Sequence, residues 1–280
     1  MNYKEILKDG SQILKSKKIF SYHLDSELLL SLAVKMDRSD VLLNLNKNIK
    51  NNEKKLFYSF IDRRKNNEPI AYIFGFKEFW KKKFKVDKNV LIPRPDTEIL
   101  IEEALKELHL NAKKNILDIG TGSGCILISI LNERKKCKGT GIDVSKKAIH
   151  IAKYNAKIQH FKNRINFINS DIDNFYTDQY DLIVSNPPYI KLIDIKGLEK
   201  DIRNHEPKIA LDGGIDGYSK IRLVIKKSSN LIKRKGKLVI EIGASQAIET
   251  IKELSLNGFY CNRIIKDLAK KNRCLVSTKI

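Results

Sequence analysis

From residue 113 onward, short apolar runs alternate with amphipathic segments along the chain. Runs with the pattern of buried strands occupy 115–119, 139–143, 165–169, 180–185 and 237–242. Helical periodicity occupies 123–132, 145–157, 218–231 and 245–254. Strands separated by helices are typical of a doubly wound, mostly parallel sheet. The last two runs, 259–265 and 273–278, have no helix between them, so we expect an antiparallel pair that closes one edge.

Residues 1–75 have a different pattern, in which helical periodicity dominates. Segments 3–15, 25–36 and 52–65 each have an apolar face, and a short helix over 41–43 follows a capping pair. This pattern predicts a small helical bundle as a separate N-terminal domain. It contains no catalytic constellation, so we interpret it as a substrate-recognition domain, although composition alone fits a stabilising appendage equally well.

Residues 76–92 connect the two regions, and aromatic and β-branched residues alternate there with lysines. This alternation predicts a β-hairpin linker, with Asp87-Lys88-Asn89 as its turn. The extended segment Pro93-Arg94-Pro95 follows, and Asp96 or Thr97 can cap a helix over 98–109. We therefore predict three parts: the helical domain at 1–75, the hairpin at 76–92, and the sheet domain at 93–280.

The first predicted strand ends in a glycine-rich motif, Asp118-Ile119-Gly120-Thr121-Gly122-Ser123-Gly124. Glycines let the backbone approach a ligand closely and open a helix N-terminus toward it. Open α/β sheets bind ligands beyond the carboxyl ends of their strands, which is where this motif lies. The spacing differs from the G-x-G-x-x-G of dinucleotide sites, so the turn favours a nucleoside without a pyrophosphate.

Acidic residues end the next two predicted strands. Asp143 ends the second strand, where a carboxylate accepts hydrogen bonds from both ribose hydroxyls of a nucleoside. Asp171 follows the third strand, where a carboxylate accepts from an adenine amino group while Ile172 packs on the ring. The sequence thus predicts a nucleoside site along this edge of the sheet.

The fourth strand, 180–185, ends in Asn186-Pro187-Pro188-Tyr189. Prolines have no N–H, so their carbonyls can stay free as acceptors, and the asparagine adds an amide oxygen. A planar group with an NH2 fits this arrangement: Asn186 and the Pro187 carbonyl accept its two hydrogens while Tyr189 packs on its plane. Asn-Pro and Pro-Pro are also common in plain turns, so the motif gains weight from the others.

Together, the four strand-end motifs resemble the class I S-adenosylmethionine-dependent methyltransferases. The Asn-Pro-Pro-Tyr form is similar to that of enzymes that methylate planar amino or amide nitrogens. Further motifs resemble the peptide chain release factor glutamine methyltransferases, the PrmC/HemK family, over nearly the whole chain. These motifs are residues 25–30, Glu68-Pro69-Ile70-Ala71-Tyr72, Gly75, Glu78-Phe79-Trp80, residues 91–98, residues 186–190 and Glu206-Pro207-Lys208-Ile209-Ala210-Leu211.

The resemblance implies a Rossmann-like sheet and methylation of the glutamine in the Gly-Gly-Gln motif of class 1 release factors. It places cofactor contacts on residues 120–124, Asp143, the position after Asp171, and Asn186, and the substrate clamp on residues 186–189. The position after Asp171 is often aromatic in the family, whereas Ile172 stands here, so aliphatic contact replaces ring stacking.

Neighbouring motifs have two interpretations each. Arg94 and Thr97 either border the cofactor or cap and pack the linker. Glu206 and Pro207 either close over the glutamine or make a turn.

Composition bears on partners and location. The net charge of +21 suggests an anionic partner such as RNA, or reflects a coding bias toward lysine. The chain's four cysteines and five histidines lack metal-ligand spacing, and it has neither a signal region nor a membrane-length apolar run. We therefore expect a cytoplasmic monomer without metal, and a function that needs no direct nucleic-acid contact.

Two alternatives stay open at this point. One is an amino-group methyltransferase that acts on adenine or guanine of DNA or RNA, which shares the nitrogen clamp and which the positive charge favours. The other is a cofactor-binding scaffold that has kept the fold without the reaction.

Overall fold

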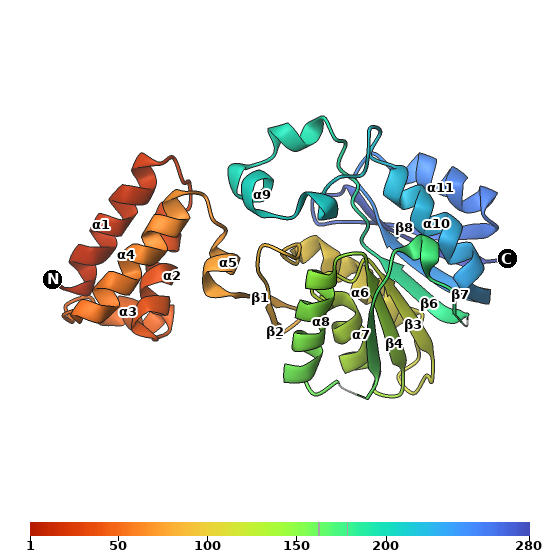
Figure 1. The fold of residues 1–280 in the computed structure, drawn as a ribbon, viewed down its shortest axis with the longest axis horizontal. Helices are drawn as coiled ribbons and strands as arrows, with labels where there is room; N and C mark the ends of the chain where they lie inside the picture. The colour runs from red at the N-terminus through yellow and green to blue at the C-terminus, as the bar shows by residue number, and fades with distance from the viewer. Residues whose placement is uncertain (162, 178) are drawn as a thin grey trace. The chain divides into compact units, whose positions relative to one another are not determined.

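The computed structural model describes residues 1–161, 163–177 and 179–280, which form two compact units. One unit comprises Met1–Gly75 with Glu199–His205, and the other comprises Phe76–Leu198 with Glu206–Ile280. Figure 1 labels the helices and strands of both units. Within the described ranges, no helix has the length and apolar content that crossing a bilayer requires.

The helices of the first unit pack around one apolar core. Ile6, Leu29 and Leu30 are fully buried in it, together with Phe57 and Ile61. The helices are α1 (Tyr3–Ser16), α2 (Tyr22–Val34), α3 (Arg38–Leu43), α4 (Asn51–Lys65) and α5 (Ile70–Phe74). The predicted helical bundle is confirmed, because each amphipathic segment turns its apolar face to the same core.

Helix α9 (Lys200–His205) belongs to this first unit although it lies far along the chain. Asp201 lies 3.9 Å from Arg64 of α4, and the same guanidinium makes a 2.7 Å ion pair with Asp25 of α2. Arg64 and Asp25 are both buried, so each charge depends on the other for compensation. A helix of six residues is too short to show a periodicity, and α9 is not among the predicted elements.

The hairpin consists of β1 (Phe76–Phe79) and β2 (Lys82–Lys85), which pair antiparallel. Its two-residue turn is formed by Trp80 and Lys81, and both have positive φ, as a type I′ turn requires. The predicted turn at 87–89 is therefore wrong for the hairpin. Asp87 does make a turn, accepting from Asn89 N at 2.8 Å, but it follows β2. Trp-Lys lacks the Asn-Gly signal that usually marks such a loop.

The described residues of the second unit form a seven-stranded sheet of order β5-β4-β3-β6-β7-β9-β8. Its strands are β3 (Asn115–Ile119), β4 (Lys138–Asp143), β5 (Ile165–Asn169), β6 (Tyr180–Ser185), β7 (Ile232–Glu241), β8 (Phe259–Lys266) and β9 (Asn272–Lys279). Strand β9 is antiparallel to both neighbours, and the other pairs are parallel. This confirms the predicted doubly wound, mostly parallel sheet with an antiparallel last strand.

Helices lie on both faces of the sheet (Figure 1), and an apolar layer fills the space beneath each set. Helices α6 (Glu98–Lys106), α7 (Cys125–Glu133) and α8 (Lys146–Ile158) pack on one face, where Ile116 and Leu182 point. Helices α10 (Ser219–Leu231) and α11 (Ala247–Leu256) pack on the other, where Leu117 and Ile183 point. Because side chains alternate along a strand, continuous apolar runs in β3 and β6 can fill both layers.

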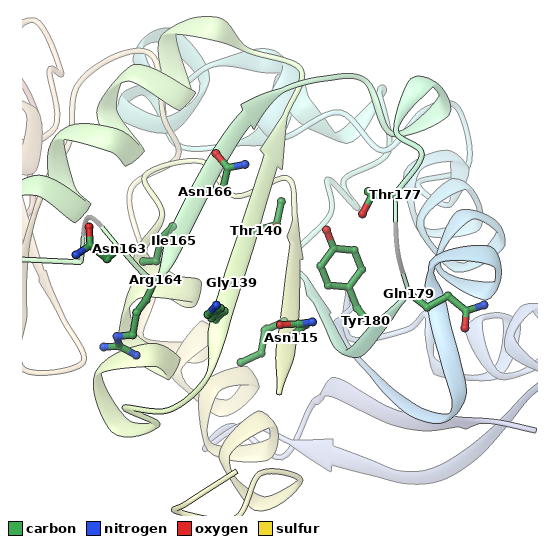
Figure 2. Close-up of a pocket in the computed structure, with 12 residues that line it drawn as sticks. Asn115, Gly139, Thr140, Asn163, Arg164, Ile165, Asn166, Thr177, Gln179 and Tyr180 are labelled. Carbon is green, nitrogen blue, oxygen red and sulfur yellow. The ribbon is translucent and has the colours of Figure 1, made fainter. Parts of the chain in front are cut away.

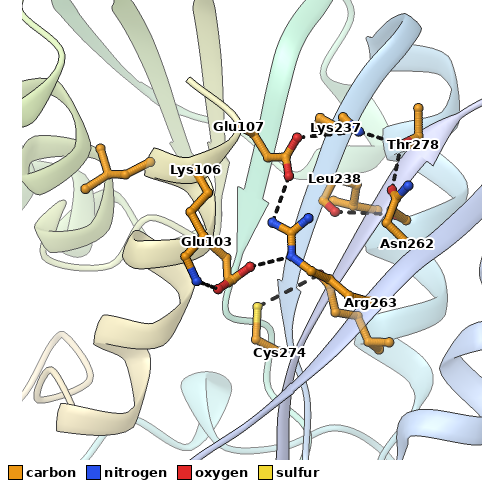
Figure 3. A network of polar contacts seen from close by, with 12 residues as sticks. Glu103, Lys106, Glu107, Lys237, Leu238, Asn262, Arg263, Cys274 and Thr278 are labelled. Carbon is orange, nitrogen blue, oxygen red and sulfur yellow. Dashed lines mark hydrogen bonds and ion pairs between the residues drawn. The ribbon is translucent and has the colours of Figure 1, made fainter. Parts of the chain in front are cut away.

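A polar network joins α6 to the edge strand β8. Figure 3 shows Arg263 directed at Glu103 and Glu107, with ion pairs of 2.7 and 2.8 Å. Burial alone would raise the pKa of Glu103, but hydrogen bonds from Lys106 and Arg263 hold that pKa below its ordinary value. Lys237 of β7 reaches Glu107 at 3.4 Å, so the helix that follows the hairpin is fixed over the sheet.

Candidate active site

The glycine-rich motif forms the turn between β3 and α7. Gly120, Gly122 and Gly124 all have positive φ, a backbone conformation that residues other than glycine rarely adopt. The N–H groups of Gly120 and Thr121 donate to the carbonyl of Ile142 in β4, at 2.9 and 3.0 Å. The turn is thus held against β4, and the glycines are required by its path.

Asp118 lies beneath this turn and is fully buried. Its Oδ2 accepts from the Thr121 hydroxyl at 2.7 Å, whereas its Oδ1 has no partner among the described residues. Burial, with a smaller contribution from the nearby charge of Asp143, raises the pKa of Asp118 to about 7, although the hydrogen bond from Thr121 opposes the rise. The Asp118 carboxyl holds the glycine turn through the Thr121 side chain. Thr121 therefore stabilises the turn and does not line the cavity.

Asp143 ends β4 and connects the glycine turn to the start of α8. Its Oδ2 accepts from Gly122 N at 2.9 Å, and its Oδ1 accepts from Ser145 N at 2.8 Å. Burial raises the pKa of this carboxyl, while the two backbone hydrogen bonds oppose that rise. Each oxygen keeps a lone pair for a further donor, so the carboxylate is fixed in direction and still able to accept.

The residues after β5 form a short 3-10 helix, η2 (Ile172–Asn174). Asp171 caps it by accepting from Asp173 N at 3.0 Å. Ile172 is buried and packs in the apolar layer under α10. Asp171 therefore stays exposed at the sheet edge while Ile172 offers an aliphatic surface beside it.

The chain leaves β6 at Ser185 and continues through the Asn-Pro-Pro-Tyr segment. Asn186 Nδ2 donates to the Thr97 hydroxyl at 3.1 Å, so its amide oxygen is turned the other way. Tyr189 donates its hydroxyl to Glu241 Oε1 at 3.2 Å. Burial and the charge of Glu241 raise the pKa of Tyr189, which keeps its hydroxyl protonated.

Glu241, the last residue of β7, is a site residue that sequence reasoning missed. Glu241 is 2% exposed, and burial raises the pKa of its carboxyl to about 7, although the hydroxyls of Thr97 and Tyr189 lower it. The guanidinium of Arg273 in β9 also favours its ionised form. The signal in the sequence is weak, because a single acidic residue at a strand end has no motif around it.

Most of the predicted site residues line one cavity of about 320 Å³ at the carboxyl ends of β3, β4, β5 and β6. From the prediction, the lining includes Gly120, Gly122, Asp143, Asp171, Ile172, Asn186, Pro187 and Pro188. Residues 89–91 after the hairpin and residues 207, 209 and 210 form another part of the wall. Leu223 and Val224 of α10 add apolar surface, so carboxylates and aliphatic side chains face the same space.

The other predicted site residues lie just outside this lining. Thr121 and Ser123 are buried inside the turn. Gly124 is the N-cap residue just before α7, and an added Cβ there would come within 2.9 Å of the Phe167 ring. Tyr189 is half-buried behind the prolines, and Gln246 donates to its carbonyl at 3.2 Å. These four residues shape the cavity from behind.

Arg94 in the segment after the hairpin and Glu206 in the loop before Pro207, each of which had two interpretations, contact each other. Glu206 is buried, pairs with the guanidinium of Arg94, and accepts from Ile92 N at 3.2 Å. The loop that contributes Pro207 to the cavity is therefore tied to the segment after the hairpin. Within the described ranges, no three His, Cys, Asp or Glu side chains gather to hold a metal ion.

A second depression of similar volume lies at the opposite, amino-terminal ends of β3, β4, β5 and β6 (Figure 2). Asn115, Thr140 and Tyr180 line it, and its described lining residues include no acidic side chain. The Arg164 guanidinium there donates to the carbonyls of Leu131, Arg134 and Cys137, which is a structural role. None of the strand-end motifs reaches this side.

Comparison with known proteins agrees with the fold. The model described as methyltransferase small domain matches residues 95–200, and the model described as PrmC N-terminal domain matches residues 5–75. A methyltransferase structure from Pyrococcus furiosus superposes with a TM-score of 0.52 at 16% identity, covering 70% of this chain and 88% of that chain. At that identity the likeness shows the fold alone. Fold, site and family models together define an S-adenosylmethionine-dependent methyltransferase.

Full-length relatives narrow the class. A release factor glutamine methyltransferase from Clostridium botulinum is 38% identical over 282 residues, covering 100% of both chains. Another from Caulobacter vibrioides is 35% identical over 95% of this chain and 92% of its own. A bifunctional methyltransferase from Rickettsia felis is 34% identical over 99% of this chain and 58% of its own. The chain therefore belongs to the release factor glutamine methyltransferase family.

Gly213 is a second residue that sequence reasoning missed, although the Gly213-Gly214 pair is a turn signal. A Cβ there would lie 2.9 Å from the Cα of Tyr189 and 2.7 Å from the carbonyl oxygen of Gly217. We expect Gly213→Ala to lower the free energy of unfolding by about 1–3 kcal/mol, because the backbone behind the clamp must shift. Gly197→Ala is the control, since an added Cβ there meets nothing within 4 Å. Equal denaturation midpoints for the two variants would contradict this packing.

Proposed function

We propose that this protein transfers the methyl group of S-adenosylmethionine to the side-chain amide nitrogen of a release factor glutamine, in the Gly-Gly-Gln motif of class 1 factors. Membership of the family supports the substrate, and relatives that match the whole chain bear that name. The observation that carries the chemistry is the orientation of Asn186. Its NH2 is engaged by Thr97, so its carbonyl oxygen is left to accept from a substrate amide at the cavity wall.

The clamp compensates for a poor nucleophile. The lone pair of an amide nitrogen is delocalised into its carbonyl, so the nitrogen needs exact orientation. Asn186 Oδ1 and the Pro187 carbonyl would accept the two amide hydrogens and hold the nitrogen in line with the methyl group. Tyr189 does not line the cavity, so its part is to support the segment from behind rather than to pack on the amide plane as the sequence predicts. Such near-attack positioning supplies about 7 kcal/mol or more of a barrier. Proton loss to water can follow transfer, and we assign no general base.

The residues of the cavity fit the cofactor. When bound, S-adenosylmethionine supplies an electrophilic methyl group on a positively charged sulfonium. Asp143 has free lone pairs for ribose hydroxyls, Asp171 stays exposed for an amino group, and Ile172 adds an apolar contact for a ring. The cavity volume of about 320 Å³ and its carboxylates suit a cationic nucleoside.

Asp143→Asn tests the ribose assignment. Both carboxylate oxygens accept from backbone N–H groups, so one of those N–H groups would then face an amide NH2. We expect the Kd for S-adenosylmethionine, measured by calorimetry, to rise about 10- to 100-fold, as loss of charged hydrogen bonds implies. Asp216→Asn, at a surface ion pair with Arg222, is the control and should leave the Kd unchanged. An unchanged Kd in the Asp143 variant would remove this residue from the site.

We further propose that the helical unit Met1–Gly75 recognises the release factor. Its helices bury their apolar residues in a core of their own. Phe20, between α1 and α2, is 99% exposed, and Leu24 one turn later is 46% exposed. A fully exposed aromatic side chain is the type of residue that dominates protein interfaces when it becomes buried.

Phe20→Ser should therefore raise the KM for release factor at least about fivefold, as losing an interface anchor of 1 kcal/mol or more implies. The Kd for S-adenosylmethionine and the unfolding midpoint should stay unchanged, because the side chain is exposed. Leu256→Ser, at a residue 83% exposed in the other unit, is the matched control. An unchanged KM in the Phe20 variant would show that release factor binds elsewhere.

The experiment that tests the activity uses purified protein and labelled S-adenosylmethionine, with release factor, duplex DNA and ribosomal RNA offered separately. We expect label on the glutamine of the Gly-Gly-Gln motif. Asn186→Ala should lower kcat about 100-fold, the loss expected from misplacing a reacting group, with a much smaller change in cofactor Kd. Asn230→Ala, at an exposed asparagine of α10, is the control.

The other outcomes distinguish the alternatives. Label on nucleic acid alone would replace the proposal with an amino-group methyltransferase of DNA or RNA, the reading that the +21 charge favours. Bound cofactor with no labelled product would favour a scaffold. Full activity in Asn186→Ala would contradict the clamp, whichever substrate is methylated.

A further inference from the structure

A series of polar side chains connects the cavity wall at Asn186 to the buried carboxyl of Glu241, which does not line the cavity. Asn186 Nδ2 donates to Thr97 Oγ1 at 3.1 Å, and the Thr97 hydroxyl is close enough to Glu241 to lower the pKa of its carboxyl. Tyr189 donates to Glu241 Oε1 at 3.2 Å. Glu241 thus accepts from Tyr189 at one end of the Asn-Pro-Pro-Tyr segment and lies near Thr97, the partner of Asn186 at the other end. It reaches them because β7 lies beside β6, with Ile240 opposite Ser185.

The number of available hydrogens decides which group donates and which accepts in this series of polar contacts. The Thr97 hydroxyl has one hydrogen, and it already accepts from the Asn186 amide. An ionised carboxylate can only accept, so the hydroxyl hydrogen of Thr97 goes to Glu241. That arrangement forces the NH2 of Asn186 toward Thr97 and its carbonyl oxygen away. A neutral carboxyl group with its own hydrogen would allow the opposite direction.

We propose that Glu241 is a positioning residue of the methyl transfer: its carboxylate takes the hydrogens of Thr97 and Tyr189 and so keeps the Asn186 oxygen aimed at the substrate amide. This inference rests on the function proposed above and adds a residue to it. Glu241 acts only through Thr97, Asn186 and Tyr189. Its second oxygen, Oε2, accepts no hydrogen bond from the described residues.

Charged and titratable groups face Glu241 from each neighbouring element. Arg273 of β9 favours the carboxylate, and Asp96 beside Thr97 opposes it. Arg273 is itself shared with Asp267 at 2.8 Å and Asp96 at 3.5 Å, so its charge is partly compensated elsewhere. The buried thiol of Cys274 also faces the site, and burial keeps its pKa well above the ordinary value.

The direction of the pH effect follows from this environment. Burial raises the pKa of Glu241 to about 7, so the carboxylate forms as the pH rises through neutrality. The rate of methyl transfer should therefore rise with pH and level off above that range. Asp118 also has a pKa raised by burial to about 7, so the wild-type profile alone does not identify the group.

The test measures the single-turnover rate of release factor methylation against pH, with saturating cofactor, for wild type and Glu241→Gln. Glu241→Gln, in which an amide of the same shape replaces the carboxylate, should lower the rate about 10- to 100-fold at pH 8, the range for losing an orienting partner. It should also abolish the rise in rate with pH near neutrality, which we call the pH limb. The KM for release factor and the Kd for cofactor should change less than about threefold, because Glu241 touches neither ligand. Asp118→Asn is the control for the other carboxyl with a pKa of about 7, and the rise in rate with pH should persist in it.

A second pair of variants keeps the inference falsifiable if Glu241→Gln folds poorly. Thr97→Val should lower the rate as Glu241→Gln does, and Thr97→Ser, which keeps the hydroxyl, should restore most of it. A Glu241→Gln or Thr97→Val enzyme with wild-type rate and an intact pH limb would overturn the inference. That result would leave the proposed function standing if Asn186→Ala were still inactive, whereas a wild type inactive on release factor would contradict the function itself.

Discussion

The parallel pairing of β3 with β6 is the constraint on which the rest of the site depends. Ile116 pairs with Leu182 and Ile119 with Ser185, so both strands end at the same edge of the sheet. The glycine turn that follows Ile119 and the Asn-Pro-Pro-Tyr segment that follows Ser185 are therefore neighbours, although more than sixty residues separate them along the chain. One slipped register would turn the apolar side chains of the strand to the wrong layer, so the core fixes the geometry of the site.

Two kinds of surface meet at that edge. The cavity has free acceptors on Asp143 and at the clamp, and it has aliphatic walls from Ile172 and α10. Behind the clamp, the buried carboxyl of Asp118 accepts from the Thr121 hydroxyl, and that of Glu241 accepts from the Tyr189 hydroxyl. A buried carboxyl is costly without such donors, so these two hydroxyls are held toward the carboxyl groups.

Much of this arrangement could be predicted from the sequence. Apolar runs with turn signals locate the strands, and parallel strands bring their carboxyl ends together, so Gly120, Asp143, Ile172 and Asn186 could be placed at one site. Local patterns do not carry contacts between distant residues. Glu241 belongs to an apolar strand with no motif around it, and only the pairing of β7 with β6 shows that it meets Tyr189.

The errors have physical causes as well. The hairpin turns at Trp80 and Lys81, where strand pairing and packing impose positive φ on residues that rarely adopt it alone. Helix α9 belongs to the helical unit because Asp201 lies near Arg64, a partnership that no periodicity shows. In both cases tertiary contacts decide what local propensity leaves open.

The most direct test of the central claim is a crystal structure of the protein with S-adenosylhomocysteine and a glutamine-containing release factor. The account predicts the glutamine amide nitrogen within hydrogen-bonding distance of both Asn186 Oδ1 and the Pro187 carbonyl, with Asn186 Nδ2 still on Thr97. A glutamine amide bound away from these two acceptors, or an Asn186 amide that turns its NH2 toward the substrate, would contradict it.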